Sequence, residues 1–207
     1  MQKRERIIKA AFELFIKNGF HKTKIADITN LAGIGKGTFY LYFKNKNELV
    51  LGAFNEFRNT IQNTMELEQV GLDENISLRA LFEKQAQILT EVLKDHQNIA
   101  RFLINDGLSI STEVTQEIKI FRKSLITTTK DTLEMAQAMG ITNNIDPELA
   151  SIQLIGSILL MYETWLDGEL VQSENTIHQS IVDYVLNAIE LDESKLKKLM
   201  QDLQGDS

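Results

Sequence analysis

Apolar residues recur at intervals of three and four along most of the chain, the spacing of one face of an α-helix. The first such segment places Ile7, Ala11 and Phe15 on one face and lysines and arginines on the other. Gly19 ends it, because glycine accepts the left-handed conformation of a helix C-cap. The pattern predicts a helix that buries one side and exposes a basic one.

Two short helices are predicted next, with a tight turn between them. The first runs from about residue 24 to 31, with Thr23 as its N-cap, and the second from about 36 to 42. Gly33 lies between them and permits the positive φ that such a turn needs. Asn45 and Glu48 then resemble a capping box, which predicts a fourth helix to about residue 69.

The remainder of the chain predicts more helices separated by glycines. Asp146-Pro147 is the clearest start signal, a capping aspartate followed by proline at the first helical position. These helices are expected near residues 76–95, 97–107, 112–139, 146–168, 174–190 and 193–203. The fold class predicted is all-α with about nine to ten helices, a three-helix helix-turn-helix head followed by a helical bundle.

Charge is divided unevenly along the chain. The net charge is -7, but residues 1–47 hold ten Lys/Arg and three Asp/Glu, which leaves 12 against 26 in the other 160 residues. A basic head on an acidic body is expected when only the head meets phosphates. The chain has no cysteine, which excludes disulfides and thiolate chemistry. The longest uncharged apolar stretch, residues 149–162, is shorter than the ~20 residues that span a bilayer, so we expect a cytoplasmic protein without a membrane partner.

The segment from Thr23 to Lys46 resembles the DNA-binding signature of the TetR family of repressors. The match rests on a turn glycine at 33, Gly37-Thr38, the run Tyr40-Leu41-Tyr42-Phe43 and the lysine at 46, and it covers about the first 50 residues. The resemblance implies a domain 1–47 that binds DNA, with the helix-turn-helix at about 24–43, joined through helix 46–69. It implies that residues 48–207 bind a ligand and dimerise.

The second helix of a helix-turn-helix enters the major groove with its N-terminal residues near base edges. Lys36, Gly37 and Thr38 hold that position, and a glycine there lets the backbone come close to DNA. Two tyrosines two residues apart cannot share one helical face, so one is expected on DNA and the other partly inside. Phe39 and Phe43 are interpreted as core. The predicted DNA-binding residues are Thr23, Lys24, Gly35, Lys36, Gly37, Thr38, Tyr40, Leu41, Tyr42 and Lys46.

Some of these roles are only implied by the resemblance. It gives Tyr42 and Lys46 phosphate contacts and turns Leu41 toward the groove. Two positions depart from the family pattern. Lys24 stands where the family has the second of two threonines and could make a longer, more salt-sensitive contact. Gly35 replaces a serine or threonine and so lacks a hydroxyl for phosphate.

The last two long predicted helices carry apolar stripes. By the resemblance they form a four-helix bundle with their copies, so that a homodimer reads a near-palindromic double-stranded operator. The expected interface residues are Ile152, Ile155, Ile158, Leu159, Ile177, Ile181 and Val185. An unknown small-molecule effector is expected to shift the spacing of the two heads. Its candidate pocket residues are Phe82, Phe102, Asn105, Phe121, Tyr162 and Trp165.

Other functions were weighed against this interpretation. His21, His96 and His178 are scattered without metal-ligand spacing, and no pair of nucleophile and base is visible, so no enzyme, metal or cofactor is predicted. The stretch 33–38 hints at a phosphate-binding loop, but glycine follows its lysine where serine or threonine is required. Two alternatives remain: an activator, and a protein-interaction module without ligand control.

Overall fold

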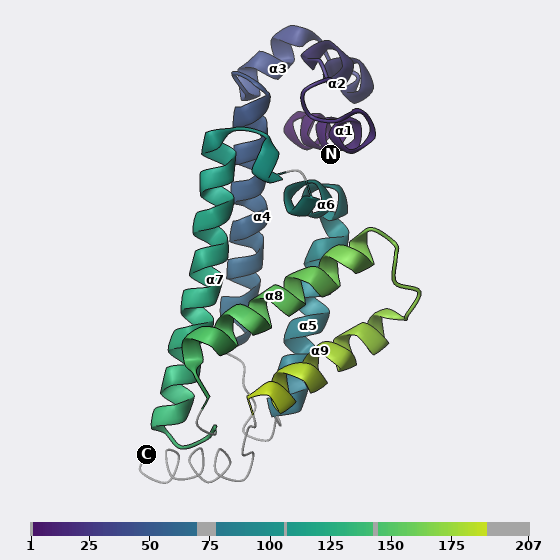
Figure 1. The fold of residues 1–207 in the computed structure, drawn as a ribbon. Helices are drawn as coiled ribbons and strands as arrows, with labels where there is room; N and C mark the ends of the chain where they lie inside the picture. The colour runs from purple at the N-terminus through teal and green to yellow at the C-terminus, as the bar shows by residue number, and fades with distance from the viewer. Residues whose placement is uncertain (1, 70–77, 106, 143–144, 190–207) are drawn as a thin grey trace. The chain divides into compact units, whose positions relative to one another are not determined.

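The computed structural model describes residues 2–69, 78–105, 107–142 and 145–189, and these ranges hold helices and no strand (Figure 1). The all-α prediction is confirmed, and the helix positions agree within a few residues. The helix predicted at 193–203 lies outside the described residues. The elements are α1 (Lys3–Asn18), α2 (Ile25–Ala32), α3 (Lys36–Tyr42), α4 (Lys46–Gln69), α5 (Leu78–Asp95), α6 (Gln97–Asn105), the 3-10 turn η1 (Gly107–Ser109), α7 (Thr112–Ala138), α8 (Pro147–Leu166) and α9 (Glu174–Ala188).

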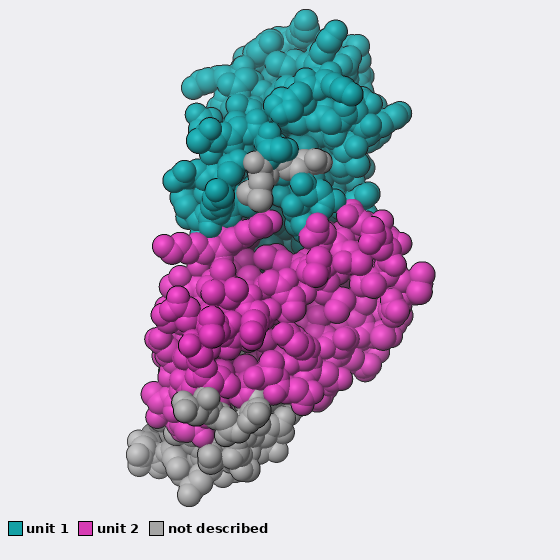
Figure 2. Space-filling model, viewed as in Figure 1, with its two compact units in different colours: residues 1–71, 91–120 teal, residues 72–90, 121–207 magenta. Residues whose placement is uncertain are grey.

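The chain forms two compact units, coloured separately in Figure 2. Unit 1 comprises residues 1–71 and 91–120, and unit 2 comprises residues 72–90 and 121–207. Helices α5 and α7 therefore contribute residues to both. The boundary predicted at residue 47 concerns function rather than packing, and it stays a prediction.

Unit 1 has an aromatic core. Phe12 and Phe15 of α1 lie edge-on to each other, and Phe102 of α6 packs against both, with ring centroids 5.3 and 5.2 Å away. Phe20 joins them at 5.0 Å from Phe15. Because Phe102 is 1% exposed and surrounded by these rings, its prediction as a pocket residue was wrong: it is core of unit 1.

Side-chain caps fix where several helices begin. Asn45 Oδ1 accepts from the Glu48 amide at 2.8 Å, and the Glu48 carboxylate accepts in return from the amide of Lys44, one residue earlier than a standard capping box. Asp146 accepts from two amides of the first turn of α8, as predicted. The N-cap of α2 is Lys24, so the assignment of Thr23 to that role was wrong.

Unit 2 contains a buried polar cluster among apolar residues. Thr90 Oγ1 of α5 lies 2.6 Å from His178 Nε2 of α9 and 3.2 Å from the hydroxyl of Tyr162 of α8. Thr90 and Tyr162 both donate to the Ala86 carbonyl, so His178 Nε2 is the donor to Thr90. Burial raises the pKa of Tyr162, and burial of the imidazole lowers the pKa of His178 against an opposing effect of Glu174.

Candidate nucleic-acid interface

The turn between α2 and α3 is held by one glycine and one arginine. Gly33 has φ 62° and ψ 44°, the left-handed conformation predicted for it. Arg6 of α1 donates to the carbonyls of Ala32 and Gly33, which end α2 and would otherwise lack partners. A Cβ on Gly33 would come within 2.9 Å of that guanidinium. The turn thus depends on glycine for its backbone conformation, and a Cβ there would also push against the guanidinium that binds the end of α2.

Helix α3 has an inner and an outer face. Phe39 is fully buried and Phe43, which follows the helix, is 3% exposed, so both belong to the core as predicted. Tyr40, Leu41 and Tyr42 are 54%, 83% and 41% exposed. Both tyrosines are partly exposed, and each ring lies beside a buried phenylalanine, Tyr40 at 5.4 Å from Phe39 and Tyr42 at 6.5 Å from Phe43, so the expected division into one outer and one inner tyrosine is not seen. Leu41 buries little of its apolar surface within the chain, so it contributes little to the stability of the fold.

The glycines at the start of α3 face open space. A Cβ built on Gly35 or on Gly37 meets no heavy atom within 4 Å, and neither residue has a positive φ. Glycine in a helix costs about 0.5–1 kcal/mol relative to alanine. The fold of this chain therefore gives no reason for glycine at 37, whereas close approach of another molecule would.

The other predicted DNA-binding residues differ in how far their side chains are exposed. Lys24 and Lys36 are exposed, and Thr38 is half-buried. Thr23 is 2% exposed, and its hydroxyl donates to the carbonyls of Gly19 and Leu14. In this conformation Thr23 supports the turn between α1 and α2 from inside and is not at the surface.

Lys46 and two arginines of the head are engaged with the protein itself. Lys46 Nζ donates to the carbonyls of Phe20 and Thr23, the latter at 2.7 Å. Arg4 pairs with Glu56 of α4, and Arg6 caps α2. Sequence patterns did not predict these internal roles, although a basic residue near the end of a helix is a known signal for hydrogen bonds to its last carbonyls.

The six predicted pocket residues are divided between the units. Phe102 and Asn105 belong to unit 1, and Asn105 is exposed at the end of α6. Phe82, Phe121, Tyr162 and Trp165 belong to unit 2, where the Tyr162 and Trp165 rings lie edge-on at 6.3 Å. Thr90 and His178, which complete the polar cluster around Tyr162, were not predicted. Their isolated polar positions within apolar stripes were the available signal.

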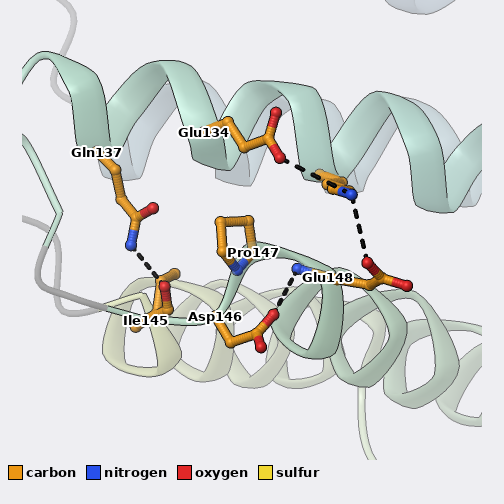
Figure 3. Close-up of a pocket in the computed structure, with 7 residues that line it drawn as sticks. Glu134, Gln137, Ile145, Asp146, Pro147 and Glu148 are labelled. Atoms are coloured by element: carbon orange, nitrogen blue, oxygen red, sulfur yellow. Dashed lines mark hydrogen bonds and ion pairs between the residues drawn. The ribbon is translucent and has the colours of Figure 1, made fainter.

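A surface hollow of about 600 Å³ lies elsewhere in unit 2, between α7 and α8 (Figure 3). It is open, and its polar groups bind one another: Gln137 donates to the Ile145 carbonyl at 2.6 Å, and Lys130 pairs with Glu148 at 3.3 Å. None of the predicted pocket residues lines it. The hollow is open to solvent and its lining is mostly polar, whereas small-molecule sites are enclosed and mostly apolar, so it is a poor ligand site.

The predicted dimer residues differ in burial between α8 and α9. Ile152 of α8 is exposed and Ile155, Ile158 and Leu159 are half-buried. The α9 residues Ile177, Ile181 and Val185 are 4%, 8% and 9% exposed, so they fill the core of unit 2, and assigning them to an interface was wrong.

An apolar stripe on α8 was only partly predicted. Leu149, Ile152 and Leu160 are 59%, 48% and 62% exposed, and Gly156 between them has open space at its Cβ. Their spacing of three, four and four residues places them on one helical face. Leu149 and Leu160 are the missed members. Among the described helices, α8 is long and apolar enough to cross a membrane by length and composition alone, which is weak evidence because core helices of soluble proteins pass the same test.

Among the described residues no group of three or more His, Asp or Glu side chains is arranged to hold a metal ion. The surface features of unit 1 are those of a helix pair that presents basic, aromatic and glycine positions outward.

Known proteins that resemble this chain are regulators of the helix-turn-helix type, in agreement with these surface features. Residues 7–53 match the family described as "Bacterial regulatory proteins, tetR family". The chain is 31% identical over 172 residues to the HTH-type transcriptional regulator YdgC of Bacillus subtilis, covering 80% of this chain and 82% of that one. It is 27% identical over 188 residues to the fatty acid metabolism regulator protein of the same organism, covering 88% and 93%.

Solved structures extend the likeness of fold over most of the chain. The regulator FadR from Bacillus subtilis, solved in complex with stearoyl-CoA, superposes with a TM-score of 0.68 at 23% identity, covering 89% of this chain and 98% of that one.

Proposed function

Because the chain belongs to the TetR family of bacterial regulatory proteins, which are helix-turn-helix transcriptional regulators, we propose that it is a dimeric repressor released from its operator by a small molecule. The observation that carries the DNA-binding part is the outer face of α3. It combines exposed Leu41 and Tyr42 with a glycine at 37 that the fold does not need. Such a face suits insertion into a major groove, where the start of the helix approaches the bases.

The homodimer is supported by the stripe on α8. Leu149, Ile152 and Leu160 expose apolar surface on one face around an open Gly156, which allows two backbones to approach. A twofold axis at this stripe would pair two copies of the chain. Two recognition helices would then read half-sites one helical turn apart, about 34 Å, and the operator would be a near-palindrome.

We place the effector in unit 2 because polar side chains are buried there among apolar ones. Thr90, Tyr162 and His178 offer hydroxyl and imidazole groups within an apolar core. An apolar molecule with a polar head could replace the hydrogen bonds among these side chains with hydrogen bonds to its own head. Since a relative of the same fold binds stearoyl-CoA, long-chain acyl thioesters are the first class to test. Binding would lower the affinity for DNA by a coupling free energy.

A cytoplasmic location and the absence of catalysis are part of the same proposal. A regulator that binds chromosomal DNA acts in the cytoplasm. The family consists of regulators rather than enzymes, which supports a chain that binds and does not transform its effector.

The first experiment selects duplexes from a random pool with the purified protein and measures anisotropy on the selected duplex and on an unrelated one. Selective binding that weakens steeply with salt is expected. Tyr42→Ala should weaken it, with circular dichroism unchanged. Equal, weak binding to both duplexes would contradict the proposal.

The effector is tested on the same complex. Trp165 is the only tryptophan of the chain and lies beside Tyr162, so its fluorescence should change when an acyl thioester binds. Release of DNA at the same ligand concentration would support the mechanism. Release without any change in Trp165 emission would move the effector site elsewhere.

A further inference from the structure

The hydroxyl of Tyr162 is buried, yet its own hydrogen bonds are long. Tyr162 is 3% exposed, and its oxygen lies 3.2 Å from both Thr90 Oγ1 and the Ala86 carbonyl oxygen. Hydrogen bonds between two oxygens are normally about 2.5–3.0 Å long. A donor buried in an apolar core with only weak acceptors is unfavourable, so this hydroxyl gains from a better partner.

Neither acceptor depends on the tyrosine. The Ala86 carbonyl accepts from Thr90 Oγ1 at 2.8 Å and, inside helix α5, also from the Thr90 amide. A carbonyl oxygen has two lone pairs, so these two donors saturate it. Thr90 Oγ1 in turn accepts from His178 Nε2 at 2.6 Å. The Tyr162 hydroxyl is therefore the spare donor of the cluster, and it can turn to another acceptor without breaking the bonds that join α5 to α9.

The surroundings of this donor favour an uncharged acceptor. Burial raises the pKa of Tyr162 and lowers the pKa of His178, so the hydroxyl and the imidazole are both neutral at neutral pH. Among the described residues of unit 2, no Asp, Glu, Lys or Arg side chain is buried. The charge that acts on His178 is the carboxylate of Glu174, which repels an anion. A ligand carboxylate would therefore be buried here without a cation to pair with.

The neighbouring positions favour an apolar body on the ligand. The Trp165 and Tyr162 rings lie edge-on with centroids 6.3 Å apart, and Leu166, one turn from Tyr162 on α8, is buried. On α9, Ile181 and Val182 lie three and four residues after His178 and are buried too. The spare donor is thus set among side chains that offer apolar contact.

We propose that Tyr162 is the residue that binds the polar group of the effector, and that this group is an uncharged oxygen acceptor, such as an ester, thioester or ketone carbonyl, on an apolar chain. This rests on the proposed function, in which the effector enters unit 2. Thr90 and His178 keep their mutual hydrogen bond and hold the helices together. An ammonium group does not suit the site, because it has no lone pair to accept from the tyrosine.

Two tyrosine variants separate a ligand contact from a structural role. Tyr162→Phe removes the hydroxyl and keeps the ring. Tyr184→Phe is the matched control, because it removes a hydroxyl from α9 of the same unit at a position 45% exposed. The probes are methyl dodecanoate, dodecanoate and dodecylammonium, which have similar chains and differ in charge. The readouts are the emission of Trp165, the only tryptophan, during titration without DNA, and the melting temperature of each free variant.

The wild-type protein should bind the ester about tenfold more tightly than either ion at neutral pH. Tyr162→Phe should bind the ester on the order of fivefold more weakly, as expected for the loss of one hydrogen bond. It should keep the wild-type melting temperature, because the hydrogen bonds that it loses are spare. Tyr184→Phe should match the wild type in both readouts.

Equal affinity of the wild type for ester and dodecanoate would overturn the uncharged class, and wild-type affinity of Tyr162→Phe for the ester would overturn the role of Tyr162. Misfolding or a lower melting temperature of Tyr162→Phe would show that its hydrogen bonds are structural, which also overturns the proposal. So would a Trp165 emission that no probe changes. DNA release is measured separately on the selected duplex: if the ester binds through Tyr162 without releasing DNA, the site stands and the proposed repressor mechanism fails.

Discussion

Substitution of Gly37 by alanine should raise stability and weaken DNA binding in the same molecule. Gly37 is the second residue of α3, has no positive φ, and leaves open space where a Cβ would lie. Alanine should therefore stabilise the folded state by about 0.5–1 kcal/mol. For a chain of this size, this raises the melting temperature by about 1–4 °C.

The same methyl group should be costly on DNA. If the helix backbone approaches a base or phosphate at Gly37, the added carbon must displace one partner, and overpacking of a filled contact costs typically about 1–3 kcal/mol. This corresponds to roughly 5- to 150-fold weaker binding if one half-site dominates, and more if both contribute. Thermal unfolding and anisotropy on the selected duplex measure the two effects.

A control separates stabilisation from contact. Thr128→Ala places alanine at an exposed position of α7 in unit 2, where helix propensity also favours it. It should raise stability slightly and leave DNA affinity unchanged. Wild-type affinity of Gly37→Ala would refute a close approach of DNA at this glycine, and a lower melting temperature would refute the reasoning from open space.

Three further outcomes are expected. Alanine at Gly33 must adopt a positive φ beside Arg6, so urea unfolding should show a loss of about 1–2 kcal/mol; an unchanged midpoint would contradict this. Leu160→Glu should give folded monomers by light scattering, whereas Leu154→Glu, at a position 4% exposed, should unfold the protein; dimers of Leu160→Glu would exclude the α8 stripe as the interface. Burial lowers the pKa of His178 below its ordinary 6.5, so its contribution to stability is present above pH 6.5 and is lost as the pH falls toward the folded-state pKa. The difference in unfolding free energy between wild type and His178→Gln should therefore shrink from pH 7.5 to pH 5. A constant difference would show that His178 does not titrate on unfolding.

The helix pattern could be predicted because it depends on local rules. Gly33, Asn45 and Asp146 act within a few residues of their own positions, through backbone freedom and amide capping. The buried rings of Phe39 and Phe43 follow from helical spacing in the same way. The turn between α2 and α3 and the inner face of α3 could therefore be predicted from the sequence.

Long-range partners could not be predicted from the same rules. Charge composition cannot distinguish a lysine that faces solvent from Lys46, whose acceptors lie 23 and 26 residues earlier. The apolar stripe of α9 gives no sign of whether Ile177 and Ile181 meet their own chain or a copy. Helical spacing could not show that Phe102 is core, because its partners Phe12 and Phe15 lie 90 and 87 residues earlier in the chain.

The place of Phe102 has a consequence for building hybrid regulators. A chimera joined at residue 47 would combine a foreign α6 with the Phe12 and Phe15 rings that this chain covers with its own phenylalanine. Any mismatch in ring size there would open or overfill the core of the head. A transplant that carries α1 through α4 together with residues 97–105 keeps these partners matched. Such an exchange between relatives therefore needs three junctions in the chain rather than one.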